Sequence, residues 1–224
     1  MEKVTTGLPR LDRLLDGGLP SKTVILVSGE AGSGKTLFGL NFVIDGASKN
    51  EKCCYVSACD DKEELLRACD EIDALKDVKK YIGKNLIFKG IPLGNRIDLN
   101  YFTKIFLSYP KVDRLIIDNV NKLLIHAKNN KEYRIKLSEL VKCSKDRVNC
   151  ALLICETKRD EIDTGNGEAF ECDGVIHLSF LELEEKPLRI LEVHKLRYTS
   201  FEPKIPHELI IDRKGLRLSG TKII

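Results

Sequence analysis

A glycine-rich segment, GEAGSGKT at residues 29–36, carries the residue types that bind phosphate. Its glycines let the backbone curl so that successive N–H groups point inward, and a following helix would place its positive end at the same point. A lysine at position 35 suits the β- and γ-phosphates of a nucleoside triphosphate, and a threonine hydroxyl at position 36 suits Mg²⁺. The predicted nucleotide site therefore consists of Gly29, Glu30, Ala31, Gly32, Ser33, Gly34, Lys35 and Thr36.

A carboxylate is expected at the same place. Asp118 ends the apolar run LIID at residues 115–118. A carboxylate at the C-terminal end of a buried strand can hold Mg²⁺ through water, and ligands of open α/β sheets bind at that edge. Taken alone, this residue would be an ordinary strand-ending aspartate. Beside a phosphate loop, it is the predicted second contact to Mg²⁺, and the predicted cofactors are ATP and Mg²⁺.

The spacing of apolar runs predicts the sheet that positions these residues. Continuous runs of strand length predict strands buried on both faces, hence a mostly parallel sheet flanked by helices. These runs lie at 23–28, 53–58, 86–88, 115–118 and 150–155, with helical patterns at 35–49, 62–70, 98–108 and 131–146. Later runs at 174–180, 188–197, 207–212 and 215–219 predict an antiparallel extension. We expect an α/β fold forming one domain over residues 1–224.

The composition narrows the class of protein. The 224 residues carry a net charge of +3, too small to indicate nucleic acid or an anionic membrane as a partner. No apolar run reaches the ~20 residues of a transmembrane helix, and no signal peptide precedes the first strand, which predicts a cytoplasmic protein. The eight cysteines lack CxxC or zinc-finger spacing. Since several lie in apolar runs, we expect them to be reduced, buried and structural.

The ordered motifs resemble the KaiC-like branch of the RecA-type P-loop ATPases. They are GLPRLDRLLDGG at 7–18, GEAGSGKT, YVSACDDKEEL at 55–65, LIIDN at 115–119 and ECDGVIHL at 171–178. The resemblance covers nearly the whole chain and implies a RecA-like fold that binds Mg·ATP. Cyanobacterial KaiC carries two such domains in tandem, so a role in circadian timing does not carry over.

A basic pair near the C-terminus has two interpretations. HKLR at 194–197 falls where relatives carry K-x-R. The resemblance implies that Lys195 and Arg197 reach across a subunit boundary to the γ-phosphate bound by a neighbour. The subunits would then form a head-to-tail ring, with six as the family expectation. The alternative is a solvated basic strand edge, because exposed edges often carry lysine.

The candidate catalytic carboxylates are Asp60 and Glu156. In relatives, a glutamate at the position of Cys59 activates or positions the water that attacks the γ-phosphate. A thiol is a poor substitute, because it is weakly ionised at neutral pH and accepts hydrogen bonds weakly. Asp60 lies one residue along, and Glu156 follows the run CALLIC, where relatives carry a polar residue that senses the γ-phosphate.

Both carboxylates also have structural interpretations. The acid cluster DDKEE at 60–64 can cap a helix, with Asp60 or Asp61 as the N-cap and Glu63 or Glu64 completing a capping box. Glu156 can be a surface residue that ends a strand. Capping explains every acid in the cluster, which favours slow turnover of bound nucleotide.

The sequence is compatible with three functions. The first is a slow ATPase or an ATP-dependent assembly switch, and the second is a non-hydrolysing scaffold resembling the ATP-binding subunit of the archaeal flagellar motor. The third, a DNA recombinase, is disfavoured because residues 157–172 hold two basic and five acidic side chains, a net −3 that repels phosphates. We expect a homo-oligomer that inserts into no membrane, and the sequence does not identify a protein partner.

Overall fold

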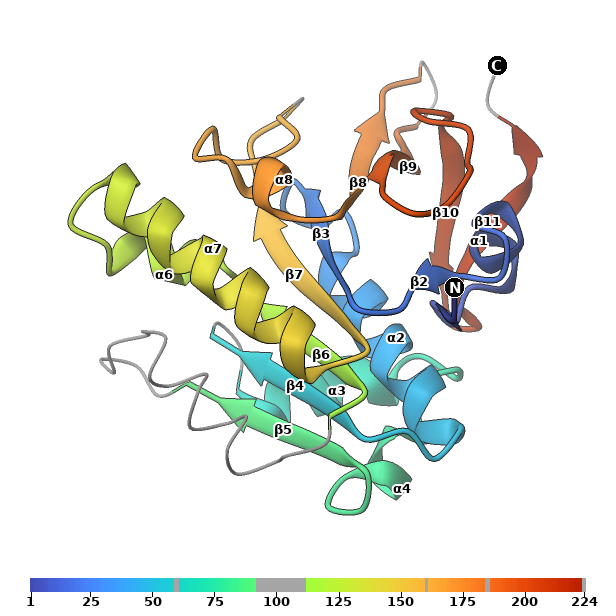
Figure 1. The fold of residues 1–224 in the computed structure, drawn as a ribbon. Helices are drawn as coiled ribbons and strands as arrows, with labels where there is room; N and C mark the ends of the chain where they lie inside the picture. Colours follow the sequence, from blue (N-terminus) through green and yellow to red (C-terminus); the bar gives the residue numbers. More distant parts are fainter. Residues whose placement is uncertain (59–60, 92–111, 160, 184–185, 223–224) are drawn as a thin grey trace.

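The computed structural model describes residues 1–58, 61–91, 112–159, 161–183 and 186–222 (Figure 1). Its strands are β1 (Lys3–Val4), β2 (Leu19–Pro20), β3 (Thr23–Gly29), β4 (Cys53–Ser57), β5 (Leu86–Gly90), β6 (Arg114–Asp118), β7 (Cys150–Glu156), β8 (Gly174–Leu181), β9 (Leu188–Leu196), β10 (His207–Asp212) and β11 (Gly215–Lys222). Its helices are α1 (Pro9–Leu14), α2 (Lys35–Ser48), α3 (Lys62–Asp70), α4 (Val78–Tyr81), α6 (Asn121–Ile125), α7 (Asn130–Arg147) and α8 (Glu168–Glu171). The helix predicted near 98–108 lies outside the described residues.

Nine strands form one sheet in the order β11-β10-β9-β8-β3-β7-β6-β4-β5. From β5 to β8 every neighbouring pair is parallel, and from β8 to β11 every pair is antiparallel. The predicted α/β fold with a mostly parallel sheet and a C-terminal antiparallel extension is confirmed. One strand differs from the expectation: β8, assigned to the extension, pairs parallel to β3 and therefore belongs to both parts.

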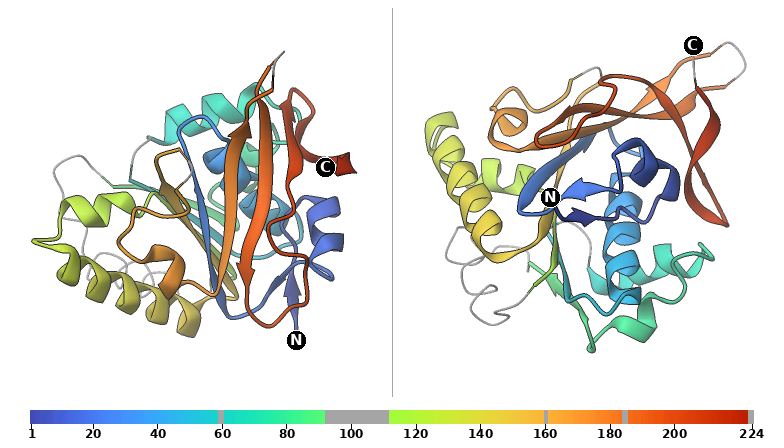
Figure 2. Two further views of the ribbon diagram at one scale, coloured as in Figure 1. Left: turned by 90° about the horizontal axis from the view of Figure 1, so that it is seen from above. Right: turned by 45° about the vertical axis from the view of Figure 1, so that its right-hand side comes forward.

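Helices cover both faces of the parallel part of the sheet. Figure 2 shows α2 on one face and α7 on the other. Accordingly, alternate residues of β3 belong to two separate apolar clusters. Ile25 and Val27 pack on the side of α2, and Val24 and Leu26 pack on the side of α7. The continuous apolar runs thus mark strands buried on both faces, as predicted. In the part of the chain that the structure describes, no helix is long and apolar enough to cross a bilayer.

The acid cluster after β4 caps a helix. The Asp61 side chain accepts from the Glu64 N–H at 2.8 Å, and the Glu64 carboxylate accepts from the Asp61 N–H at 3.1 Å. This reciprocal pair is a capping box at the start of α3. The capping interpretation is confirmed for Asp61, and Asp60 and Cys59 lie outside the described residues.

A buried arginine at the start of β6 ties three segments together. Arg114 is fully buried, and its guanidinium donates to the Thr5 and Phe42 carbonyls at 2.7 and 2.8 Å. It also pairs with the Asp45 carboxylate at 3.0 Å and with Glu51, and it lies 4.7 Å from the centre of the Phe42 ring. The network joins the N-terminal segment, α2 and the sheet, so its loss should affect all three.

Most described cysteines serve the core. Six are buried and Cys143 is half-buried, which confirms the predicted burial for those six: Cys53, Cys54, Cys69, Cys150, Cys155 and Cys172. Burial raises the pKa of the Cys54 and Cys150 thiols to about 12. These thiols are therefore unreactive at neutral pH while the fold is intact.

Candidate functional site

The glycine-rich segment forms a tight turn between β3 and α2. Gly29, Gly32 and Gly34 have φ values of 151°, 78° and 106°, which side chains with a Cβ rarely adopt. A Cβ on Gly29 would lie 2.0 Å from the Leu178 carbonyl oxygen, so no other residue fits there. The helix α2 begins at Lys35, immediately after the turn. The geometry is that of an anion-binding loop followed by the positive end of a helix.

Lys35 lies inside this turn. Only 9% of its surface is exposed, and its Nζ donates to the Glu30 carbonyl at 2.8 Å. Burial lowers the pKa of Lys35, and the nearby carboxylates of Glu156 and Asp118 oppose that shift. A buried ammonium that donates to a backbone carbonyl at the start of a helix is suited to receive a phosphate oxygen.

Three oxygen-bearing side chains meet beside the lysine. The Thr36 hydroxyl donates to Asp118 Oδ2 at 2.9 Å, and the Tyr55 hydroxyl donates to the same oxygen at 2.6 Å. Asp118 ends β6 and is 5% exposed. A hydroxyl and a carboxylate in contact provide the hard oxygen donors that Mg²⁺ prefers, so these residues fit that ion. Sequence reasoning named Thr36 and Asp118 but missed Tyr55, whose contact with Asp118 spans 63 residues of the chain.

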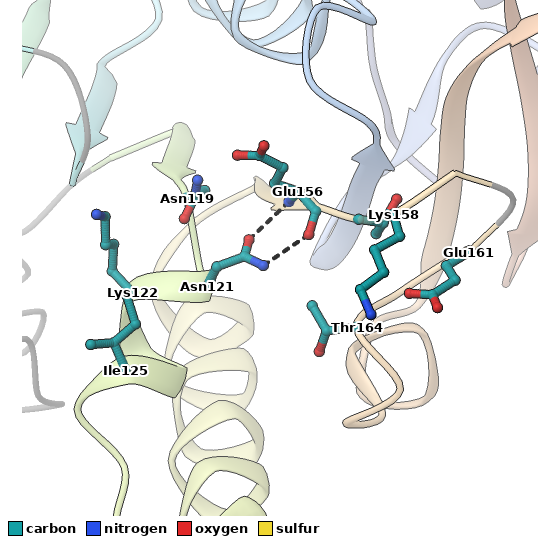
Figure 3. A pocket seen from close by; sticks show the side chains of 9 residues that line it. Asn119, Asn121, Lys122, Ile125, Glu156, Lys158, Glu161 and Thr164 are labelled. Atoms are coloured by element: carbon teal, nitrogen blue, oxygen red, sulfur yellow. Dashed lines mark hydrogen bonds between the residues drawn. The ribbon is translucent and has the colours of Figure 1, made fainter.

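Glu156 lies next to the phosphate loop. It ends β7, and in the parallel pairing it stands opposite Gly29. The Asn121 side chain holds its backbone twice: the Glu156 N–H donates to Oδ1 at 2.8 Å, and Nδ2 donates to the Glu156 carbonyl at 2.9 Å. Figure 3 shows the carboxylate directed away from that asparagine, at the rim of a cavity of about 510 Å³. The Asn121 clamp therefore leaves the carboxylate free to face the site.

A smaller cavity of about 260 Å³ lies over the loop itself. Its lining consists of Gly32, Gly34, Lys35, Thr36, Leu37, Arg189 and Ile211. Arg189 reaches it from β9, where its Nε donates to the Gly32 carbonyl at 3.2 Å and its guanidinium lies 5.3 Å from the Phe180 ring centre. Sequence reasoning missed Arg189, because nothing in its local spacing connects it with a loop residue 157 positions earlier in the chain.

A family model for the ATPase KaiC matches residues 4–92 and 98–222. The chain belongs to the KaiC family. Circadian clock protein KaiC3 of Synechocystis sp. is 25% identical over 96% of this chain, which spans 45% of that protein's length. The UPF0273 protein PF1931 of Pyrococcus furiosus is 24% identical, with 100% of this chain and 96% of that protein aligned.

A solved structure shares the fold. The KaiC-like protein PH0186 of Pyrococcus horikoshii superposes with a TM-score of 0.82 at 24% identity, covering 97% of this chain and 99% of that one. The predicted resemblance to the KaiC-like, RecA-type ATPases is therefore confirmed. The roles of individual site residues are not tested by these similarities and stay predictions.

The basic pair of the KaiC-like K-x-R position is held within its own subunit. Lys195 Nζ donates to the backbone carbonyls of Ala169, Phe170 and Cys172 at 3.0, 3.3 and 2.6 Å, at the end of α8. Burial and the neighbouring Arg197 lower the pKa of Lys195. The Arg197 guanidinium lies 3.5 Å from the buried Asp173 carboxylate, with half of its side chain exposed. Arg197 is therefore the more available cation of the two, since Lys195 would first have to leave its carbonyls.

Proposed function

We propose that this KaiC-family protein binds Mg·ATP and acts as a slow ATPase or as a switch whose assembly depends on ATP. The observation that carries the proposal is the convergence of Lys35, Thr36 and Asp118 at the glycine turn. Bound Mg²⁺ would supply positive charge to the phosphate oxygens. Lys35 and the loop N–H groups would bind the phosphates, Thr36 and Asp118 would hold the ion, and Glu156 would orient water at the rim.

Two measurements separate a hydrolysing protein from a non-hydrolysing one. Nucleotide affinity and steady-state ATP hydrolysis should be determined on the same preparation. Tight binding with a measurable, slow turnover supports the switch or slow ATPase. Tight binding without turnover supports the alternative, a non-hydrolysing scaffold, which is favoured by the thiol at position 59. No nucleotide binding would contradict both.

A substitution at position 59 tests why turnover would be slow. We expect Cys59→Glu to raise ATP turnover by about tenfold or more, because a positioned general base typically contributes about 10²–10⁴ in rate. The assay is steady-state phosphate release with saturating Mg·ATP. Cys59→Gln is the control, because glutamine is similar in size to glutamate but has no basic carboxylate. This variant should leave turnover low. Brisk hydrolysis by the parent that Asp60→Asn abolishes would instead make Asp60 the base and contradict this prediction.

Assembly gives a second test. We propose a head-to-tail ring, with six subunits as the family expectation, in which Arg197 and Lys195 contact nucleotide bound by the neighbour. A non-hydrolysable ATP analogue should then raise the mass measured by light scattering. We expect Lys195→Ala with Arg197→Ala to weaken this assembly, while each subunit still binds nucleotide through its own loop.

The single variants distinguish the two interpretations of the basic pair. Arg197→Ala alone removes the exposed cation and should reproduce most of the loss of assembly. Lys195→Ala alone removes a cation together with the hydrogen bonds that it donates at the end of α8. Exposed Lys142 on α7 provides a control, because Lys142→Ala should assemble like the parent. A double variant that assembles as well as the parent would return both residues to the solvated strand edge.

The remaining expectations form part of the same proposal. We infer one domain over residues 1–224, a cytoplasmic location and a protein partner of unknown identity. The acidic balance of residues 157–172 supports a function without nucleic acid.

A further inference from the structure

A buried histidine adjoins the base of the phosphate loop. His177, 5% exposed, stands opposite Ser28 in the parallel pairing of β8 with β3. Ser28 Oγ and His177 Nδ1 lie 3.0 Å apart, within hydrogen-bonding distance. Ser28 directly precedes Gly29, so this bond sits at the point where the strand becomes the loop. Because Ser28 is fully buried, its hydroxyl is not available as a nucleophile.

A second histidine supports the first. In the pairing of β9 with β8, Val175 faces Lys195 and Ile176 faces Val193, so His194 is an extra residue that forms a bulge. The His194 ring meets the His177 ring edge-on, with centroids 5.6 Å apart and planes at 72°.

Glu192 completes the arrangement. It is the register partner of His177, and its Oε2 lies 3.4 Å from His194 Nε2. The hydrogen bond to His194 lowers the pKa of Glu192, so its carboxylate is ionised at neutral pH. Ser28, His177, and the pair Glu192–His194 thus run across three adjacent strands. Among the described residues, no three potential metal ligands are grouped closely enough to hold an ion, so the cluster is a hydrogen-bonded and packed unit.

The position of β8 determines where the loop starts. Gly29 packs so closely on the Leu178 carbonyl that a Cβ would lie 2.0 Å from the oxygen. Any change in how β8 sits against β3 would therefore displace the first residue of the loop. The hydrogen bond between the His177 and Ser28 side chains fixes the register of β8 against β3. It lies one residue before the close contact of Gly29 with Leu178.

We propose that His177 is a positioning residue for the phosphate loop, kept in its rotamer by His194 and Glu192. The inference rests on the proposed nucleotide binding and adds a residue that touches no phosphate. It acts through Ser28 and Gly29: a held register keeps the loop N–H groups directed at one point, which lowers the cost of organising them when nucleotide binds.

Replacement of His177 by two residues tests the proposal. His177→Phe removes the polar atom, and we expect the Kd for Mg·ADP and for a non-hydrolysable ATP analogue to rise by about 3–10-fold. His177→Asn places an amide near the position of Nδ1 and should bind within about twofold of the parent. The matched control is His207→Phe, since His207 is equally buried, 6% exposed, at the start of β10. Isothermal titration calorimetry gives the constants, and circular dichroism shows that each variant is folded.

The outcomes are distinct. Ser28→Ala removes the hydroxyl partner of the same hydrogen bond and should also raise the Kd for nucleotide. This variant replaces His177→Phe in the test if His177→Phe fails to fold. Unchanged affinity in either folded variant, or an asparagine variant as weak as the phenylalanine one, would overturn the positioning role. A parent chain that binds neither nucleotide would overturn the proposed function along with it. A parent that binds while His177→Phe binds equally well would overturn this inference alone.

Discussion

Lys35→Ala should raise the Kd for Mg·ATP by about 10–100-fold. A hydrogen bond from a charged donor contributes about 1.5–3 kcal/mol, and each 1.4 kcal/mol is a factor of ten in affinity. Among the described residues, the buried ammonium has no carboxylate within hydrogen-bonding distance, and it donates to the neutral backbone carbonyl of Glu30. The affinity should be measured by calorimetry with a non-hydrolysable analogue.

The fold should survive this substitution. Burial lowers the pKa of Lys35, which means that the surroundings disfavour its charge, so its removal should not reduce the unfolding midpoint. Lys49→Ala offers a matched control, because Lys49 follows the other end of α2 and pairs with Asp45. Its nucleotide affinity should equal that of the parent. An unchanged Kd in Lys35→Ala would remove the phosphate loop from the proposed function.

Arg114→Ala should be the most destabilising single change considered. It removes the guanidinium that pairs with Glu51, leaves Asp45 in an ion pair with Lys49 alone, and removes the donor to the Thr5 and Phe42 carbonyls. Breaking a buried ion pair from one side costs about 3–5 kcal/mol. For a chain of this size that corresponds to a fall in Tm of about 6–20 °C, measurable by differential scanning calorimetry.

Two further variants make the test specific. Arg114→Lys keeps the charge but loses the planar fork, so it should fall between the parent and the alanine variant. Arg217→Ala breaks an exposed two-bond pair with Asp212 and should leave the Tm nearly unchanged, because exposed pairs contribute little. If Arg114→Ala and Arg217→Ala had the same Tm, the buried network would not stabilise the fold.

Local patterns predicted the elements and the phosphate loop well. The run TVILVS became β3, the pattern at 131–146 became α7, and the acid cluster gave a capping box at Asp61. Each of these depends on neighbours in sequence: apolar periodicity, glycine spacing, or an acid three residues from an N-cap. The position of Asp118 at the end of a strand was predicted as well, since a strand-ending carboxylate is a local signal.

Apart from the approach of Asp118 to the phosphate loop, the contacts between distant segments were not predicted. Tyr55 and Arg189 reach the site from strands whose local sequence gives no sign of it. Arg114 looks like a polar residue before a strand until the fold brings Glu51 and the N-terminal segment around it. The parallel pairing of β8 was likewise missed, because apolar alternation gives the existence of a strand but not its direction.

The place of β3 in the sheet bears on how the chain is made in a cell. Its two neighbours, β7 and β8, are synthesised about 120 and 145 residues after it, so no adjacent strand is available when it leaves the ribosome. At roughly 5–20 residues per second, that delay is about 6–30 seconds. Until β7 is made, neither edge of the apolar segment TVILVSG has its native partner strand. The yield of native protein should therefore depend on what shelters this nascent strand during translation, as much as on the stability of the finished fold.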